Sequence, residues 1–161
     1  MDRWNAFSDE WDDLYPQVEG WKSNVRRLVQ SGNTLGMSVY ELFPEQTQCP
    51  YHFHHGNEEL ILVLRGQPTL RTPDGEHELQ PGDVVHFAKG AAGAHQVVNR
   101  TDETARYVVA DAHVSPEIVE YPDSGKLAAM ARTESQRGGP IWTIHRLDRE
   151  VDFFDGEQPH M

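Results

Sequence analysis

The sequence has little of what several classes of protein require. It contains a single cysteine, Cys49, so no disulfide can form within the chain. No apolar run approaches the roughly 20 residues that a membrane-spanning helix needs. The first residues also lack the basic and then apolar segments of a secretory signal peptide. We therefore expect a cytoplasmic protein whose fold does not depend on disulfides.

Positive charge is also scarce. The chain carries 14 lysine and arginine residues against 26 aspartate and glutamate residues, a formal net charge of −12. Such an acidic surface repels phosphate backbones and anionic lipid headgroups, so we expect no nucleic-acid partner and no membrane partner. The sequence has no Ser/His/Asp set and no nucleotide-binding fingerprint. The partner that we expect instead is a small-molecule ligand.

Turn-forming residues, in contrast, are plentiful. The 161 residues include 13 glycines and 10 prolines, and the length is that of one domain. Asp74-Gly75 is the strongest hairpin signal. Short extended runs separated by turn signals predict an all-β sandwich or small barrel rather than βαβ units. These runs are residues 34–43, 51–54, 59–65, 68–72, 75–79, 83–88, 95–99 and 105–110.

Two regions flank this predicted barrel of residues 34–112. Residues 1–33 form an acidic arm with five large aromatics, too many to leave in water, so we predict that the arm packs on the barrel or on a second subunit. These aromatics are Trp4, Phe7, Trp11, Tyr15 and Trp21. In the C-terminal extension, residues 113–161, we predict a short helix at 126–132 and a strand at 141–147.

Potential metal ligands are concentrated in the barrel region. His52 and His54 point the same way if they lie on one extended strand, with Cα atoms about 6.6 Å apart. A carboxylate follows after a short turn, and His95 comes much later in the chain. Imidazole nitrogens with a carboxylate oxygen suit Mn, Fe, Co, Ni or Zn. Four protein ligands would leave a six-coordinate ion two open positions, unlike the closed and cysteine-rich structural zinc sites.

The spacing around these residues resembles both motifs of the cupin superfamily. The first motif matches His52, His54, Glu59 and Gly66, and the second matches Gly82, Gly90, His95 and Asn99. The resemblance covers about half of the chain and looks like the small single-barrel bacterial cupins of the cupin 2 type. It implies a double-stranded β-helix, the cupin jelly-roll barrel. It also implies that the metal ligands are His52, His54, Glu59 and His95.

Two departures from the cupin pattern lie before His95. Ala88 stands where the second motif usually has proline, and four residues instead of two separate Gly90 from His95. The insertion at residues 91–94 could loop outward and leave His95 in register. It could also reshape the mouth of the pocket and displace His95.

The carboxylate ligand could be Glu58 or Glu59. Counting back six residues from Gly66 favours Glu59, and so does its place at the start of a strand, on the face of Ile61 and Val63. A β-bulge would shift this alternation and favour Glu58.

Other polar residues have weaker indications of function. We expect His55 to face solvent and His86 to be a half-buried strand residue. Cys49, three residues before His52 on an extended chain, should point to the opposite face. Four further side chains could contact a substrate, although sequence parity does not place them: Tyr40, Tyr51, Gln96 and Arg106.

The pattern favours a metal-dependent enzyme, oxygenase-like or isomerase-like, that acts on a small organic molecule in a cavity walled by Ile61, Val63 and Val97. The cupin resemblance does not choose the reaction, because the fold hosts many. The alternative is a non-catalytic barrel that captures a sugar or carboxylate through its metal. No general base is identifiable from the sequence. We also expect a homodimer, since cupins commonly pair through their sheets.

Overall fold

The computed structural model describes residues 1–15, 18–29, 34–135, 139–148, 150–151 and 155. Within these ranges the regular elements are β-strands, apart from two short 3-10 turns, η1 (Ala91–Gly93) and η2 (Pro122–Ser124). The predicted all-β class is therefore confirmed. In the described part of the chain, no helix has the length and apolar character to cross a bilayer.

The largest sheet has six antiparallel strands in the order β1-β2-β3-β10-β5-β8. Its strands are β1 (Asp13–Tyr15), β2 (Ser23–Val29), β3 (Leu35–Leu42), β10 (Ala105–Ala112), β5 (Glu59–Arg65) and β8 (Val84–Phe87). Strand β10 lies between β3 and β5, so segments distant in sequence pair side by side. Such long connections between neighbouring strands are typical of a jelly roll.

A three-stranded sheet closes the barrel, in the order β7-β6-β9. Its strands are β6 (Thr69–Thr72), β7 (Gly75–Glu78) and β9 (Gln96–Val98). The predicted hairpin at Asp74-Gly75 joins β6 to β7, and Gly75 has a positive φ of 126° there. Apolar side chains from both sheets form the buried core: Leu42, Ile61, Val63, Leu70, Leu79, Phe87, Val97 and Tyr107.

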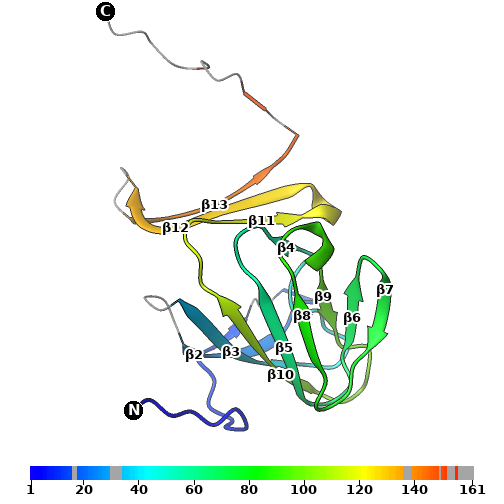
Figure 1. Ribbon diagram of the computed structural model, residues 1–161. Coiled ribbons are helices and arrows are strands. Elements are labelled where there is room, and N and C mark those ends of the chain that lie inside the picture. Colours follow the sequence, from blue (N-terminus) through cyan, green and yellow to red (C-terminus); the bar gives the residue numbers. More distant parts are fainter. Residues whose placement is uncertain (16–17, 30–33, 136–138, 149, 152–154, 156–161) are drawn as a thin grey trace, which may run out of the picture.

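A third sheet covers one end of the barrel, as Figure 1 shows for the hairpin of β12 and β13. Its order is β13-β12-β11-β4, and its strands are β4 (Phe53–His54), β11 (Glu117–Tyr121), β12 (Lys126–Ser135) and β13 (Gly139–Arg146). The predicted strand at 141–147 is confirmed by β13. We call β11, β12 and β13 the C-terminal strands.

The predicted helix at residues 126–132 is wrong, because these residues belong to β12. The helix-forming side chains there suggested a helix from local propensity. Pairing with β11 on one side and β13 on the other satisfies the backbone of this segment in a sheet instead. Tertiary pairing commonly overrides propensity in this way.

The N-terminal region extends the largest sheet of the same chain. Strand β2 pairs with β3 across the predicted boundary at residue 34, and the division into arm, barrel and extension stays a prediction. The guanidinium of Arg106, 4% exposed, lies 2.6 Å from Asp9 and 2.5 Å from Glu41. It also lies over the ring of Trp11, 4.9 Å from the ring centre. Arg106 therefore holds the arm to the barrel.

Candidate metal centre

Two backbone segments bring the predicted ligands together at one end of the barrel. His54 ends β4, and Glu59 begins β5. His52 and His95 exchange two backbone hydrogen bonds, of 3.1 and 2.9 Å between N and O. This bridge places the distant His95 directly beside the His-x-His pair.

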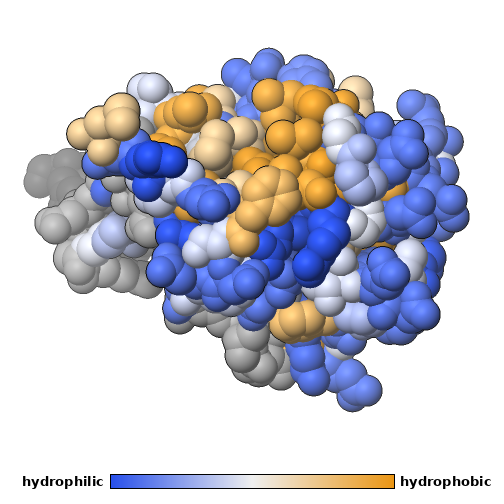
Figure 2. All heavy atoms as spheres, turned by 90° about the horizontal axis from the view of Figure 1, so that it is seen from below, coloured by the Kyte–Doolittle hydropathy of each residue, from blue (hydrophilic) through white to orange (hydrophobic). Residues whose placement is uncertain are grey.

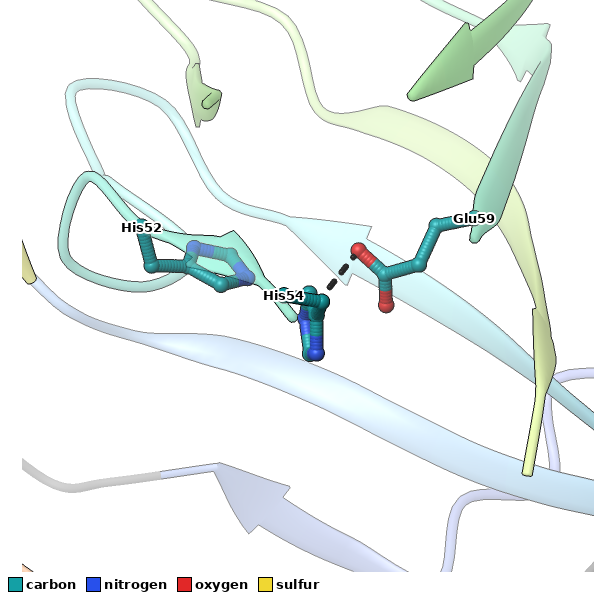
Figure 3. A group of neighbouring side chains, drawn as sticks. All are labelled: His52, His54 and Glu59. Carbon is teal, nitrogen blue, oxygen red and sulfur yellow. Dashed lines mark ion pairs between the residues drawn. The ribbon is translucent and has the colours of Figure 1, made fainter. Parts of the chain in front are cut away.

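The four side chains converge on a common point. Nε2 of His54 and Nε2 of His95 lie 3.4 and 3.2 Å from the same oxygen, Oε2 of Glu59. The ring of His52 is centred 5.1 Å from that of His54 and 4.6 Å from that of His95. Figure 3 shows three of these side chains turned toward one another, and their ligand atoms all lie within 4.8 Å of one another. We call the four residues the histidine–glutamate cluster.

Hydrogen bonds fix the orientation of two of the histidine rings. Nδ1 of His52 lies 2.9 Å from the carbonyl oxygen of Pro50, and Nδ1 of His95 lies 2.9 Å from that of Gly93. A carbonyl only accepts, so each Nδ1 carries the proton and each Nε2 keeps a lone pair for an ion. The ring of His95 also stacks on Phe87, with 3.7 Å between ring centres.

The ring nitrogens of His54 indicate that a metal ion fits this cluster. Both nitrogens are buried, and neither has a hydrogen-bond partner among the described residues. A buried polar atom without a partner costs about 1–3 kcal/mol. Coordination of an ion by one of these nitrogens would remove part of this cost. Three imidazoles and a carboxylate are also a donor set that first-row divalent ions accept, so the residues present fit a transition metal.

The protonation states of the cluster suit a cation. Burial, with the neighbouring His95, lowers the pKa of His52 to about 4. Burial alone would raise the pKa of Glu59, but its contact with His95 and the charges of the histidines lower it to about 2. At neutral pH the cluster therefore offers a neutral imidazole at His52 and an ionised carboxylate at Glu59.

The structure places Glu59, and not Glu58, in the cluster. The side chain of Glu59 is 13% exposed and faces the histidines. The side chain of Glu58 is 54% exposed and lies 3.4 Å from Nε2 of His86 on the outer surface. The pairing of β5 with β10 is regular here, with Glu59 opposite Asp111 and Leu60 opposite Ala110, so no bulge shifts the alternation.

The insertion before His95 loops outward and leaves His95 beside Glu59. Ala91 and Ala92 are exposed in the 3-10 turn, while His95 is 5% exposed. Gly93 packs so closely that an added Cβ would lie 1.8 Å from the carbonyl oxygen of Ala88. Of the two alternatives that the sequence leaves open, the structure shows the first. The role of the four residues as ligands stays a prediction.

The placement predicted for Cys49 is wrong. Its Sγ lies 3.4 Å from Nδ1 of His52, and the residue lines the cavity beside the cluster. Residues 48 and 49 form a bend rather than a continuous strand, so the alternation of side chains does not apply to them. Burial raises the pKa of the Cys49 thiol, which keeps it protonated at neutral pH.

The remaining polar candidates differ in whether they line the cavity beside the cluster. Tyr40 lines the cavity, whereas Tyr51 packs under the guanidinium of Arg71 and Gln96 donates to the carbonyl of Cys49. His55 faces away as predicted, with its ring 2.7 Å from Glu120. His86 lies on strand β8 as predicted, with its side chain about half exposed, at 53%, and its Nε2 3.4 Å from Glu58.

The cluster lies in a cavity of about 220 Å³, which we call the metal cavity. This volume is below the ~300–1,000 Å³ of pockets for drug-sized ligands, which favours a small ligand. Ile61 and Val97 line the metal cavity as predicted, whereas Val63 lies in the barrel core. The C-terminal strands add three large side chains to the lining: Tyr121, Met130 and Trp142.

The sequence gives little sign of a second polar pair, Asp111 and His113. Nε2 of His113 lies 3.0 Å from Oδ2 of Asp111, and Asp111 is the cross-strand neighbour of Glu59. Both residues line a hollow, the polar hollow, that shares Tyr40, Glu59 and Trp142 with the metal cavity. Burial raises the pKa of Asp111, against the charge of His113. Their spacing of two along one strand end was the available signal, but it has no partner in the cupin motifs.

Comparison with known families agrees with this geometry. The family model of the cupin domain matches residues 39–111, which hold the whole cluster and most of the barrel. Residues 39–111 of this chain form a cupin domain. Cupin domains commonly bind a metal, and in this cupin His52, His54 and Glu59 form a group that could hold one. No curated protein matches the chain.

Solved structures extend the similarity beyond the cupin domain. A sugar phosphate isomerase of the cupin superfamily from Silicibacter pomeroyi is 27% identical, with a TM-score of 0.68 over 83% of this chain and 82% of that one. A candidate sugar phosphate isomerase from Acidithiobacillus ferrooxidans is also 27% identical, with a TM-score of 0.69 over 82% and 81%. The polyketide cyclase RemF from Streptomyces resistomycificus, at 24% identity and a TM-score of 0.59 over 73% and 83%, shares the fold.

Proposed function

We propose that this cupin is a metal-dependent isomerase that acts on a small hydroxylated carbonyl compound of the sugar class. The observation that carries the proposal is the convergence of the histidine–glutamate cluster in a cavity open to solvent. The similarity to two structures described as a sugar phosphate isomerase and as a candidate for that activity supports this reaction class.

A divalent ion bound by the cluster would supply Lewis-acid polarisation of a carbonyl or hydroxyl oxygen. The positions that the protein leaves open suit two neighbouring oxygens, which an α-hydroxycarbonyl compound offers. Ile61, Val97 and Val109 line the same cavity with apolar surface. The side chains of the protein thus provide orientation and an apolar wall beside the substrate.

Isomerisation also moves a proton between adjacent carbons, which requires an acid–base group. Asp111 and His113 form a carboxylate–imidazole pair beside Glu59, and such pairs commonly transfer protons in enzymes. They line the polar hollow next to the metal cavity. We propose that this pair exchanges protons with the substrate, and that Tyr40 contacts the substrate between the two hollows.

The charges of the lining bear on the choice between a sugar and its phosphate. Among the described residues, no lysine or arginine lines the metal cavity. Arg27 lines the polar hollow, which it shares with Ser38 and His113. If the substrate carries a phosphate, we expect that phosphate to bind on the side of Arg27.

The experiment that tests this function follows solvent deuterium. Protein loaded in turn with Mn, Fe, Co, Ni or Zn is incubated in D2O with a panel of aldoses, ketoses and their phosphates. NMR should show deuterium at the carbon next to the carbonyl, with Glu59→Gln inactive and Asp111→Asn strongly slowed. Ligand binding without exchange would favour the non-catalytic binding barrel, and oxygen uptake would favour an oxygenase. Failure to bind any of these metals would overturn the proposal.

We also propose that this cupin forms a homodimer through the outer face of β5 and β8. Leu62 and Val84 are cross-strand partners on this face, 38% and 63% exposed, and Leu60 beside them is 44% exposed. Figure 2 shows apolar side chains gathered in a patch bordered by hydrophilic ones. Contiguous exposed apolar surface at a sheet edge favours association. Sedimentation should give a dimer at micromolar concentration and a monomer for Val84→Glu, and a wild-type monomer would contradict the proposal.

A further inference from the structure

His54 differs from the other two histidines of the cluster. His52 and His95 each place Nδ1 2.9 Å from a backbone carbonyl oxygen, and these contacts fix their tautomers. Nδ1 of His54 has no hydrogen-bond partner among the described residues. The acceptor that faces it is the carboxylate of Glu117, with Oε1 at 3.7 Å. The ring of His54 thus lies between two carboxylates, Glu59 at Nε2 and Glu117 at Nδ1.

Glu117 is held firmly in this position. It begins β11, which pairs with β4 through Val119 and His54, and its side chain is 4% exposed. Its Oε1 accepts hydrogen bonds of 3.1 Å from the backbone N–H groups of both His55 and Gly56. These bonds fix the turn between His54 and Glu59, the two ligands on either side of it.

Gly56 has no side chain and therefore leaves space for the carboxylate of Glu117. A Cβ added to Gly56 would lie 2.6 Å from Oε2 of Glu117. Oε2 itself is buried and has no hydrogen-bond partner among the described residues. A buried carboxylate with one oxygen unpaired is costly, which is an unusual arrangement for a residue whose role is only to support a turn.

We infer that Glu117 is a positioning residue for His54: its carboxylate accepts the Nδ1–H of this ring and directs Nε2 toward Glu59. This inference rests on the proposed metal centre. The present separation of 3.7 Å exceeds a hydrogen bond by about half an ångström, which a small turn of the ring would close. A carboxylate on the second nitrogen of a ligating histidine fixes its tautomer and raises its basicity.

Glu117 lies outside residues 39–111, the part that the cupin domain model matches. The C-terminal strands therefore complete a site whose ligands all come from the barrel. A cupin domain cut at residue 111 would keep the four ligands and lose the group that orients one of them.

The test compares Glu117→Gln with Glu120→Gln, a neighbouring carboxylate on β11 that contacts the non-ligand His55. Affinities for Zn²⁺ and Co²⁺ are measured by competition with a chromogenic chelator. Glu117→Gln keeps an oxygen for the His55 and Gly56 N–H groups but loses the charge, and we expect 10–100-fold weaker binding. Glu120→Gln should bind within twofold of wild type. The visible absorption spectrum of the Co²⁺ form should also change for Glu117→Gln alone.

A double-mutant cycle separates positioning of His54 from support of the turn. In a His54→Ala background, the effect of Glu117→Gln on Co²⁺ affinity should vanish, because the ring through which it acts is absent. Wild-type affinity in Glu117→Gln, or the same loss with and without His54, would overturn the inference. If wild-type protein binds neither ion, the proposed metal centre fails first, so the two failures are distinguishable.

Discussion

The cupin domain and the C-terminal strands contribute to the site in different ways. The domain, residues 39–111, supplies all four members of the cluster, and their rings and carboxylate are mostly buried and in close contact. The C-terminal strands supply Glu117 behind His54 and the residues at the cavity mouth, where Trp142 is 71% exposed. The comparison teaches that the proposed metal ligands and the residues at the cavity mouth come from separate parts of this chain, so substitutions should separate metal binding from ligand binding.

The largest effect on metal affinity is expected from removing one of the proposed ligand side chains of the cupin domain. Glu59→Gln should weaken Zn²⁺ or Co²⁺ binding by more than the ~100-fold that the loss of an outer partner can cause. Glu58→Gln, one residue away on the solvent side, should leave the affinity unchanged. Metal content after dialysis and chelator competition measure both variants. If Glu58→Gln lost the metal and Glu59→Gln kept it, the assignment of Glu59 as the carboxylate ligand would be wrong.

Acid should destabilise the metal-free protein through His52. Its pKa is about 4 when folded and 6.5 as the ordinary value, so below pH 6.5 the unfolded chain binds a proton that the folded chain does not. Stability should fall by about 2–3 kcal/mol from this residue between pH 6.5 and 4.5. Glu59 adds its own loss only below pH 4.5, because its pKa is lowered from 4.5 to about 2.

Urea unfolding of the metal-free protein at several pH values measures this effect. His52→Gln cannot titrate and should lose correspondingly less stability over the same window. Parallel curves for the variant and the wild type would show that His52 is not the group responsible.

Two glycines, one in the loop before His95 and one in β13, differ in the space that an added side chain would have. Gly93→Ala would force its Cβ against the carbonyl of Ala88 in the cupin domain, and we expect a loss of about 1–3 kcal/mol in stability together with weaker metal binding. Among the described residues, none has an atom within 4 Å of a Cβ added to Gly139, in β13. Gly139→Ala should therefore be nearly neutral in thermal unfolding. Equal stability of the two variants would mean that the loop can move away from Ala88 at little cost.

The smallest effect on metal affinity is expected from substitutions at the mouth of the metal cavity. Trp142 is on β13 and lines both the metal cavity and the polar hollow, whereas Ile144 on the same strand lines neither. Trp142→Ala should weaken binding of a sugar ligand about 3–10-fold, since an aromatic face contributes about 0.5–1.5 kcal/mol. Metal affinity and stability should not change. Ile144→Ala is the control, and isothermal titration with the best substrate of the deuterium assay distinguishes the variants.

The sequence was most informative where chemistry and spacing agreed. The position of Gly66 identified Glu59 rather than Glu58. Strand β5 pairs with β10 in regular register from Glu59 to Val63, and the register shift beside Arg65 leaves the face of Glu59 unchanged. The hairpin at Asp74-Gly75 followed from local turn preference alone. Local reasoning failed at 126–132, where pairing with two other strands outweighs helix propensity, and at Cys49, where a bend interrupts the alternation.

By itself the sequence determined the all-β class, the cupin family and the four residues of the cluster, because turn signals and motif spacing are local properties of the chain. Only the tertiary structure decided that Asp111 and His113 lie beside Glu59 and that Glu117 faces His54. The physical reason is strand pairing: β10 and β11 return beside β5 and β4 from more than 40 residues away, through contacts that no short motif encodes.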